Sequence, residues 1–495
     1  MPCSFSPADC ARILGCPISP VSSLRSPGRG ISTDSRRLRP GELFLALRGE
    51  SFDGHDYLTA AAARGACAAI VDATAAPRHP PLPLLPVADT HQAHQNLARA
   101  WRRQLGLPLV AVTGSAGKTT TRELIKALLA PLGIIHASQE NENNGIGVPR
   151  TILTADETVA AMVVEMAMRG PGEIAELSRC AEPDLAVITN IGSAHIGRLG
   201  SREAIASAKC EITTALSSTG LVVVPAGDRL LEASLAASWQ GPVHRVALRS
   251  DIFPSDLPPA DRYGQLKGNE LRLGGRCWRL PLPGTHQARN LMLALACAEH
   301  LGAMPENRHL DQVRLPGGRA RQLLLGPVTL WDETYNASPE AVLATTDMVA
   351  EQQGRHFAVL GPMLELGSFG QDWHQRIGRH VGRRGFDGLV VVDDGPLGDA
   401  LVAGAGRTLP VVQVSEPRAA LDHLLAWLKP GDHLLLKASR SIALERLIPL
   451  LQAQLNSAQA QDPSPEKVLR PEDWPENQAF SALQHQPTGR GAPRR

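Results

Sequence analysis

Residues 109–123 read LVAVTGSAGKTTTRE, and this stretch decides the fold. Its first four residues are apolar and predict a buried strand, Gly114 to Gly117 predict a tight turn, and a helix is expected from Thr119 onward. The N–H groups of such a turn and helix start converge on one point, where the helix dipole favours an anion. We therefore predict a nucleotide phosphate site formed by Thr113, Gly114, Ser115, Ala116, Gly117, Lys118, Thr119 and Thr120.

The residues that follow the turn have separate expected roles. Lys118 supplies a positive charge to the outer phosphates, and the Thr119 hydroxyl is suited to a Mg²⁺ shell. The stretch departs from the pattern G-x-x-x-x-G-K-[ST], because Val112 stands in the place of the first glycine. Dinucleotide binding fits less well, since G-x-G-x-x-G is absent. ATP with Mg²⁺ is the expected ligand.

Strands alternate with helices on both sides of this stretch. The pattern predicts an α/β protein with mostly parallel sheets, and 495 residues at roughly 150 per domain suggest three domains. We place an N-terminal α/β domain at 1–88, a central nucleotide-binding domain at 89–313 and a doubly wound, Rossmann-like domain at 314–455. The tail, 456–495, is rich in Gln, Pro, Ser and Glu and is expected to be disordered.

Composition excludes several classes of function. With 50 basic and 49 acidic residues the net charge is +1, so no general attraction to nucleic acid or anionic lipid is expected. The eight cysteines show no C-x-x-C spacing, which argues against zinc or redox sites. Neither a signal peptide nor a membrane-length apolar run is found. We expect a cytoplasmic protein without membrane insertion, acting as a monomer.

Three further residues are candidates for metal chemistry. Glu165 ends an apolar strand, and His195 follows another, so both belong on the sheet edge where open α/β folds bind ligands. Lys209 lies on the next expected helix. Taken alone, each residue also has an ordinary structural interpretation that fits as well as a metal role or better. Glu165 could be a solvent-facing charge, His195 a structural histidine and Lys209 a solvated lysine.

Several motifs together resemble the Mur ligase family over roughly residues 30–450. The most distinctive read NENNGIGVP (141–149), EMAMRGPGEI (165–174), GTHQARN (284–290) and DETYNASP (332–339). Further matches lie at 33–36, 40–44, 52–55, 190–212 and 363–367. Gln287, Ser338, Pro362 and Ala438 depart from the family pattern. The chain is most similar to the branch that adds D-alanyl-D-alanine to UDP-N-acetylmuramoyl-tripeptide.

The resemblance implies an ATP-dependent peptide ligase of cell-wall (peptidoglycan) synthesis. ATP phosphorylates the terminal carboxylate of the UDP-linked tripeptide, and the amine of D-Ala-D-Ala attacks the acyl phosphate to give UDP-MurNAc-pentapeptide. Two anions must meet in the first step, and Mg²⁺ with Lys118 would offset their repulsion. Residues 1–88 would bind the UDP-sugar.

The resemblance also assigns roles to residues. Thr119 and Glu165 would hold one Mg²⁺, and His195 and a carbamylated Lys209 a second, which makes Lys118, Glu165, His195 and Lys209 the catalytic set. Further nucleotide contacts would come from Asn290, Arg319, Asp332, Tyr335 and Lys437. Candidates for the UDP-linked substrate are Ser35, Glu50, Ser51, Phe52, Asn143 and Asn144.

Two alternatives remain open from the sequence. A ligase of the branch that adds a single amino acid to UDP-MurNAc-dipeptide shares most of these motifs, although no DNPR-like motif is found. A nucleotide-binding P-loop protein without ligase activity would bind ATP but would release no phosphate in response to a dipeptide.

Overall fold

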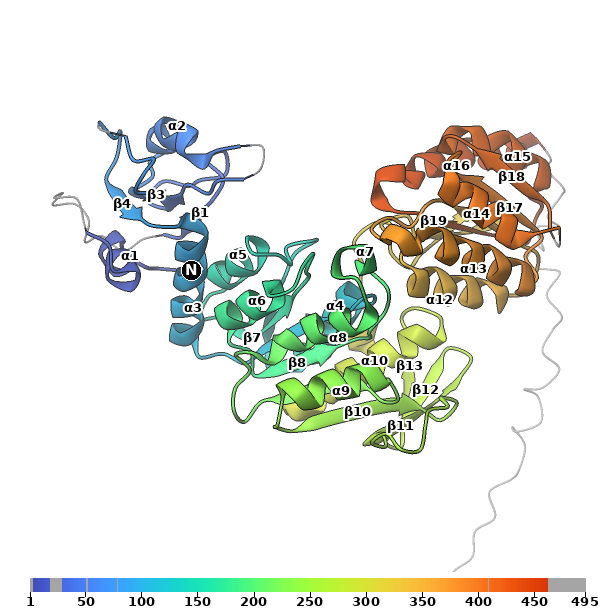
Figure 1. The fold of residues 1–495 in the computed structure, drawn as a ribbon, viewed down its shortest axis with the longest axis horizontal. Coiled ribbons are helices and arrows are strands. Elements are labelled where there is room, and N and C mark those ends of the chain that lie inside the picture. The colour runs from blue at the N-terminus through green and yellow to red at the C-terminus, as the bar shows by residue number, and fades with distance from the viewer. Residues whose placement is uncertain (1–2, 18–28, 50–51, 78, 408, 462–495) are drawn as a thin grey trace, which may run out of the picture.

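The computed structural model describes residues 3–17, 29–49, 52–77, 79–407 and 409–461. Three sheets follow one another along the chain and form the separate bodies in Figure 1. The α/β class and the mostly parallel strand pairing are as predicted. Glu50, Ser51 and residues 462–495 of the expected tail lie outside the described residues.

The N-terminal sheet has four parallel strands in the order β1-β2-β3-β4. Alternate residues of β2 face opposite sides: Leu43 and Leu45 belong to the core that includes α3, and Phe44 packs with Leu58 of α2. The elements are α1 (Pro7–Leu14), β1 (Ile31–Ser32), β2 (Leu43–Leu45), η1 (Gly54–Tyr57), α2 (Leu58–Ala63), β3 (Ala68–Asp72) and β4 (Leu84–Val87).

Helix α3 (Thr90–Leu105) joins the N-terminal sheet to the central body (Figure 1). The sequence offers Asp89 and Thr90 as caps for this helix, and Asp89 is the one used: its carboxylate accepts from the N–H groups of His91 and Gln92 at 2.7 and 3.0 Å. Trp101 meets Phe5 edge to face at 5.4 Å, and its indole N–H donates to the carbonyl of Ala155 at 2.9 Å. The helix is therefore anchored on both sides.

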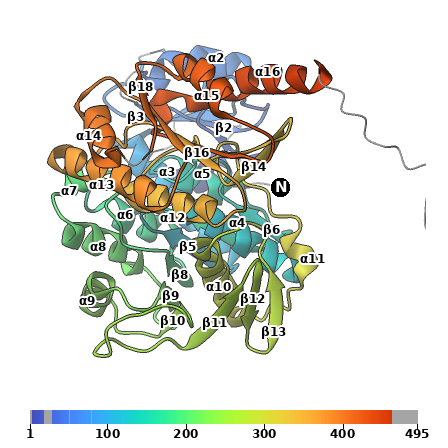
Figure 2. The same cartoon turned by 90° about the vertical axis from the view of Figure 1, so that its right-hand side faces the viewer.

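The central sheet has nine strands in the order β13-β12-β11-β10-β9-β8-β5-β7-β6, and its strands pair parallel except for the antiparallel pairs β11–β12 and β12–β13. Strands β12 and β13 lie with β11 at one end of the molecule in Figure 2. The strands are β5 (Leu109–Thr113), β6 (Ile134–Ala137), β7 (Val159–Glu165), β8 (Leu185–Ile188), β9 (Leu221–Pro225), β10 (Val243–Leu248), β11 (Arg262–Lys267), β12 (Glu270–Leu273) and β13 (Arg276–Arg279).

Helices cover both faces of the central sheet. Val110 and Val112 of β5 pack with α4 and α10, whereas Leu109 and Ala111 pack with α3, α5, α6 and α8. The helices are α4 (Lys118–Leu129), η2 (Ala130–Leu132), α5 (Gly147–Thr154), α6 (Glu173–Ala181), α7 (Ile196–Leu199), α8 (Arg202–Cys210), η3 (Glu211–Thr213), α9 (Arg229–Ser238), α10 (Thr285–His300) and α11 (Asn307–Leu310).

The C-terminal sheet has six strands in the order β14-β15-β19-β16-β17-β18, with β14 antiparallel to β15. Helices α12, α13 and α14 cover one face, and α15 and α16 cover the other. The elements are β14 (Arg321–Leu325), β15 (Val328–Asp332), α12 (Pro339–Ala350), β16 (His356–Leu360), η4 (Gly367–Phe369), α13 (Gly370–Arg383), β17 (Gly388–Val392), α14 (Pro396–Ala405), β18 (Val411–Val414), η5 (Pro417–Ala420), α15 (Leu421–Trp427), β19 (His433–Lys437), η6 (Arg440–Ile442), η7 (Leu444–Arg446) and α16 (Leu447–Gln461).

One helix has bounds that differ from those the sequence predicts. The pattern from Ser441 onward predicts the last helix, but α16 begins at Leu447, because Ala443 takes a left-handed conformation (φ +56°) between two short 3₁₀ turns. It then continues to Gln461, past the predicted start of the tail at 456, in a run of Ala and Gln that favours helix. Among the described residues, none of the helices is long and apolar enough to cross a membrane.

The buried His94 of α3 predicts a pH-dependent stability. Burial lowers its pKa to about 3, with smaller contributions from His91 and Arg150. The unfolded chain takes up a proton near the ordinary histidine pKa while the folded chain stays neutral, so stability present above about pH 6.5 is lost as the pH falls toward 3. When the pH falls from about 7.5 to 5.5, the free energy of unfolding of the His94→Gln variant should decrease by roughly 1 kcal/mol less than that of the wild type. Thermal melting at both pH values measures this, with the exposed His423→Gln as control; equal losses in wild type and His94→Gln would contradict it.

Candidate active site

A cleft of about 1200 Å³ lies between the central and C-terminal bodies. The carboxyl ends of β5, β7 and β8 form its floor, and residues that precede β14 or follow β15 and β19 face them. Most predicted site residues line this one cleft: Ser115, Ala116, Gly117, Lys118, Thr119, Thr120, Asn143, Glu165, His195, Asn290, Arg319, Tyr335 and Lys437. Thr113 and Gly114 lie buried beneath it.

The phosphate loop is held by the segment after β8. The carbonyl of Asn190 accepts from the N–H of Ser115 at 3.1 Å, and its side-chain oxygen accepts from the N–H of Ala116 at 3.0 Å. The Ser115 hydroxyl accepts in turn from the N–H of Gly192 at 2.8 Å. The loop is therefore positioned by tertiary bonds as well as by its own turn.

Gly117 immediately precedes helix α4, and this position needs to be glycine. Its φ is +80°, and an added Cβ would lie 2.9 Å from the side-chain oxygen of Asn290. Asn290 comes from α10, where its side-chain amide donates to Gln287 at 3.0 Å. Loop and α10 thus approach closely at the predicted nucleotide site.

Lys118 points back over the loop, and its amine donates to the carbonyl of Gly114 at 2.8 Å. Burial lowers the pKa of Lys118; Glu165 opposes this shift and Arg319 adds to it. Lys118 and Arg319, which come from different domains, therefore lie close enough to repel each other, and an anion bound between them would be stabilised.

Glu165 receives three side-chain donors, all from the central body. Thr119 donates to Oε2 at 2.9 Å, Asn143 to Oε1 at 2.8 Å, and Arg122 to Oε2 at 3.2 Å. The Glu165 N–H donates to Ser138 at 3.1 Å. The carboxylate is buried, and its orientation is fixed.

The oxygens of Thr119 and Glu165 fit Mg²⁺, which prefers oxygen ligands. Within the described ranges no three His, Cys, Asp or Glu side chains form a metal-binding group. This is compatible with Mg²⁺, which is usually bound by one or two protein ligands together with phosphate and water. The predicted first metal pair is brought together.

His195 and Lys209 are the second predicted metal pair. The His195 Nδ1 lies 2.5 Å from a carboxylate oxygen of Glu365 in the C-terminal body. Burial lowers the pKa of His195, and the Lys118 and Lys209 charges lower it further, against the effect of Glu365. Lys209 lies buried behind the cleft rather than on its lining.

The environment of Lys209 is unusual for a lysine. Its side chain is 2 % exposed, and among the described residues its amine has no hydrogen bond or ion pair. Burial and then the nearby Lys118 lower its pKa well below the ordinary value. A neutral amine is what this environment favours, and a solvated helix lysine is excluded.

Three of the predicted nucleotide contacts line the cleft from the C-terminal body. The guanidinium of Arg319 stacks on the Tyr335 ring at 3.3 Å, and the Lys437 amine lies 3.4 Å from Glu333 and 3.1 Å from the carbonyl of Asn336. Asp332 is placed differently: it is buried off the cleft, and its carboxylate accepts from the N–H and hydroxyl of Thr334.

The residues predicted for the UDP-linked substrate do not form one cluster. Asn143 lines the cleft, but Asn144 caps the turn into α5, accepting from Ile146 and Gly147. Ser35 is buried in the N-terminal body, and Phe52 is half exposed there. Sequence reasoning missed Arg122, Glu340 and Glu365. Arg122 had a local signal, because it lies three residues after Thr119 on the same helix face, and Glu365 lies within the family match at 363–367.

Comparison with known proteins identifies the family. Residues 29–102 match the model for the Mur ligase family, catalytic domain; residues 112–298 match the Mur ligase middle domain; and residues 319–440 match the Mur ligase, glutamate ligase domain. The UDP-N-acetylmuramoyl-tripeptide--D-alanyl-D-alanine ligase of Synechocystis is 41% identical over 427 residues, covering 86% of this chain and 92% of the relative. The chain belongs to the Mur ligase family.

Solved structures agree with this assignment. A crystal structure of MurF from Acinetobacter baumannii superimposes with a TM-score of 0.82 at 28% identity, covering 91% of this chain and 99% of that one. MurF from Thermotoga maritima, in complex with ADP, gives a TM-score of 0.77 at 26% identity, covering 87% and 98%. The Mur ligase middle-domain match contains the phosphate loop, Glu165, His195 and Lys209. The predicted resemblance and fold are confirmed.

Gly117→Ala should weaken nucleotide binding by about tenfold or more, because a left-handed alanine costs roughly 1–2 kcal/mol and its Cβ displaces Asn290. Calorimetric titration with ADP and Mg²⁺ measures this. Gly106→Ala is the matched control: its φ is +61°, nothing lies within 4 Å of its added Cβ, and it is remote from the cleft. An equal loss of ADP affinity in both variants would rule out a local effect.

Proposed function

We propose that this Mur ligase adds D-alanyl-D-alanine to UDP-N-acetylmuramoyl-tripeptide at the expense of ATP, giving UDP-MurNAc-pentapeptide. One observation carries the proposal. The phosphate loop, the Glu165 carboxylate and two cations of a second domain, Arg319 and Lys437, line one cleft in a chain that aligns over most of its length with ligases of this name. We place the reaction in the cytoplasm and expect a monomer, with no nucleic acid or membrane partner.

The proposed reaction has two steps. A carboxylate oxygen of the tripeptide attacks the γ-phosphorus of ATP, and the bond between that phosphorus and the bridging oxygen breaks. ADP departs as the leaving group, and the tripeptide carboxylate becomes an acyl phosphate. The neutral amine of D-Ala-D-Ala then attacks the acyl carbon, and the tetrahedral intermediate collapses to the amide with loss of inorganic phosphate and the amine proton. Phosphorylation is needed because a free carboxylate is a poor acylating agent.

The chain's own residues bind and orient the reactants. The loop N–H groups and Lys118 hold the β- and γ-phosphates, Asn290 and Tyr335 hold the nucleoside, and Arg319 and Lys437 reach phosphate from the other side. Thr119 and Glu165 would hold one Mg²⁺, which when bound would offset the repulsion between carboxylate and phosphate. A cleft closed by two domains would exclude water from the acyl phosphate.

Lys209 and His195 are proposed to serve a second Mg²⁺. The neutral Lys209 amine would add carbon dioxide and lose a proton, which converts a cation into a carboxylate-like ligand. Two observations support this: the lowered pKa, since a charged lysine does not react, and the lack of a partner for the amine within the part of the chain that the structure describes. Asp332 is proposed to contact the ribose indirectly at most, given its bond to Thr334.

The N-terminal body is proposed to bind the UDP-sugar. Among the described residues of that body, the candidates are Ser35 and Phe52. Two more, Asn143 and Asn144, belong to the loop between that body and the metal site. The candidate set also includes Glu50 and Ser51. Asn143 is supported most directly, because it lines the cleft and bonds Glu165.

Purified protein with ATP, Mg²⁺ and UDP-MurNAc-tripeptide should release phosphate only when D-Ala-D-Ala is added. Mass spectrometry should find the pentapeptide product. A preference for UDP-MurNAc-dipeptide with a single amino acid would establish the other Mur branch instead. ATP binding without dipeptide-dependent phosphate release would mean a nucleotide-binding protein without ligase activity.

Lys209→Ala should abolish turnover, a loss of at least about a thousandfold, because the buried metal ligand is removed. Millimolar formate or acetate should restore part of it by supplying a carboxylate in the vacated space. Lys209→Met, which fills that space, is the matched control and should not respond. Absence of rescue in the alanine variant would count against carbamylation.

A further inference from the structure

Arg122 of helix α4 makes more contacts near the metal pair than the proposed reaction uses. Its side chain is 1 % exposed. One Nη atom donates to Glu165 and to the carbonyl of Glu140, both at 3.2 Å, and the rest of the guanidinium donates to Glu123 at 3.0 and 2.7 Å. A buried arginine thus connects the helix, a loop and the metal carboxylate.

The loop that Arg122 holds carries a residue of the cleft. Glu140, whose carbonyl it bonds, has φ +44°, a conformation that non-glycine residues rarely adopt without support. Three residues on, Asn143 donates to Glu165 at 2.8 Å, and its carbonyl accepts from the N–H of Ala167 at 2.8 Å. Arg122, which holds the loop at Glu140, and Asn143, which belongs to the loop, therefore both fix the Glu165 carboxylate.

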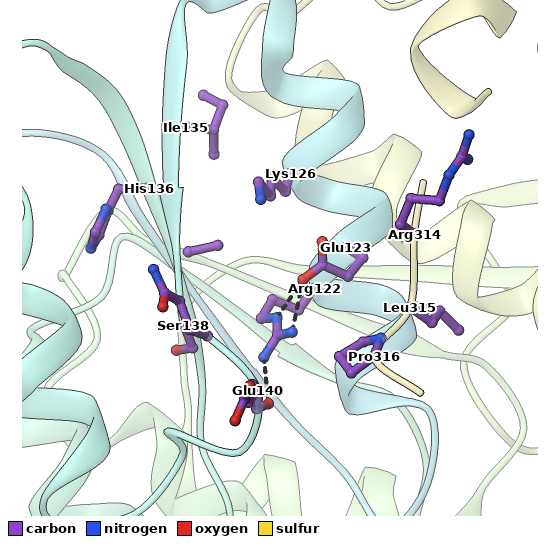
Figure 3. A pocket seen from close by; sticks show the side chains of 12 residues that line it. Arg122, Glu123, Lys126, Ile135, His136, Ser138, Glu140, Arg314, Leu315 and Pro316 are labelled. Carbon is purple, nitrogen blue, oxygen red and sulfur yellow. Dashed lines mark hydrogen bonds and ion pairs between the residues drawn. The ribbon is translucent and has the colours of Figure 1, made fainter. Parts of the chain in front are cut away.

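Behind Arg122 lies a second cavity of about 390 Å³, bounded by α4, β6 and residues 314–316 that lead to the C-terminal body. Figure 3 shows the guanidinium at its edge, bonded to Glu123 and Glu140. Lys126, one turn further along α4, lines the same cavity and has no bond to Glu165. The side of Arg122 away from Glu165 is thus not closely packed.

The position of the guanidinium has an electrostatic consequence. Arg122 and Thr119 bond the same oxygen of Glu165, so a metal ion held by Thr119 and Glu165 would share that carboxylate with a fixed positive charge. Two cations on one carboxylate repel each other, so the arginine weakens the attraction of Glu165 for a metal while keeping it oriented.

We propose that Arg122 is a positioning residue: it orients Glu165 and the 139–146 loop for the metal–nucleotide complex, and it lowers the affinity of the site for the metal. Because the proposal rests on the metal and nucleotide binding assigned above, its test reads metal binding directly. A failure of the ligase assignment would leave the wild type without dipeptide-dependent phosphate release, whereas a failure of this inference would leave that activity intact.

Arg122→Gln should have opposite effects on binding and turnover. Removal of the positive charge should tighten Mn²⁺ binding to the ADP complex roughly three- to tenfold, as read by electron paramagnetic resonance. Loss of orientation should lower kcat at least about tenfold. A residue with a merely structural role would weaken Mn²⁺ binding along with turnover.

Two further variants complete the test. Lys126→Gln makes the same charge change on the same helix and cavity and should change Mn²⁺ affinity less than about twofold; Arg122→Lys keeps the charge and should do the same. Unchanged or weaker Mn²⁺ binding in Arg122→Gln, or equal tightening in Lys126→Gln, would overturn the proposal. If Arg122→Gln does not fold, Arg122→Lys tests the proposal. In that variant, amide hydrogen exchange in residues 139–146 should become faster while the Mn²⁺ affinity stays unchanged, and an unchanged exchange rate would overturn the proposal.

Discussion

The bonds between Asn190 and the phosphate loop connect the parts of this site. On one side, the segment 189–195 supports the loop through the carbonyl and side chain of Asn190. On the other, the N–H of Ser193 donates to Glu340 at 2.6 Å, and His195 meets Glu365, both residues of the C-terminal body. Since these few residues touch the loop, the second metal pair and the other domain, a movement of the C-terminal body acts on the phosphate site through them.

Positive charge is concentrated in the cleft and directly behind it. Burial lowers the pKa of Lys118 and of Lys209; the Lys118 charge lowers the pKa of Lys209 further, and Arg319 lowers that of Lys118 further. Such an arrangement is unfavourable when empty of anions and favourable when phosphate enters. The same charges support the proposal that Lys209, which has no carboxylate partner in the described part of the chain, would become an anionic ligand.

Local pattern predicted the phosphate loop, because strand, turn and helix lie within fifteen consecutive residues or so. The positions of Glu165 and His195 followed from the rule that parallel strands end at one edge. Glu340 and Glu365 were missed because they reach the site across a domain boundary, which no local pattern records. The burial of Lys209 was equally invisible, since a single helical lysine gives no sign of what packs over it, and the late start of α16 depended on the left-handed Ala443.

The C-terminal cations are held loosely enough to exchange partners. Lys437 lies 3.4 Å from Glu333, at the long end of hydrogen-bond distances, and Arg319 rests on an aromatic face with one buried nitrogen that has no partner among the described residues. A phosphate oxygen offers both groups a stronger, charge-assisted bond than they now have. In the proposed reaction, nucleotide binding would therefore gain from drawing the two domains together, and the resulting enclosure would protect an acyl phosphate from hydrolysis.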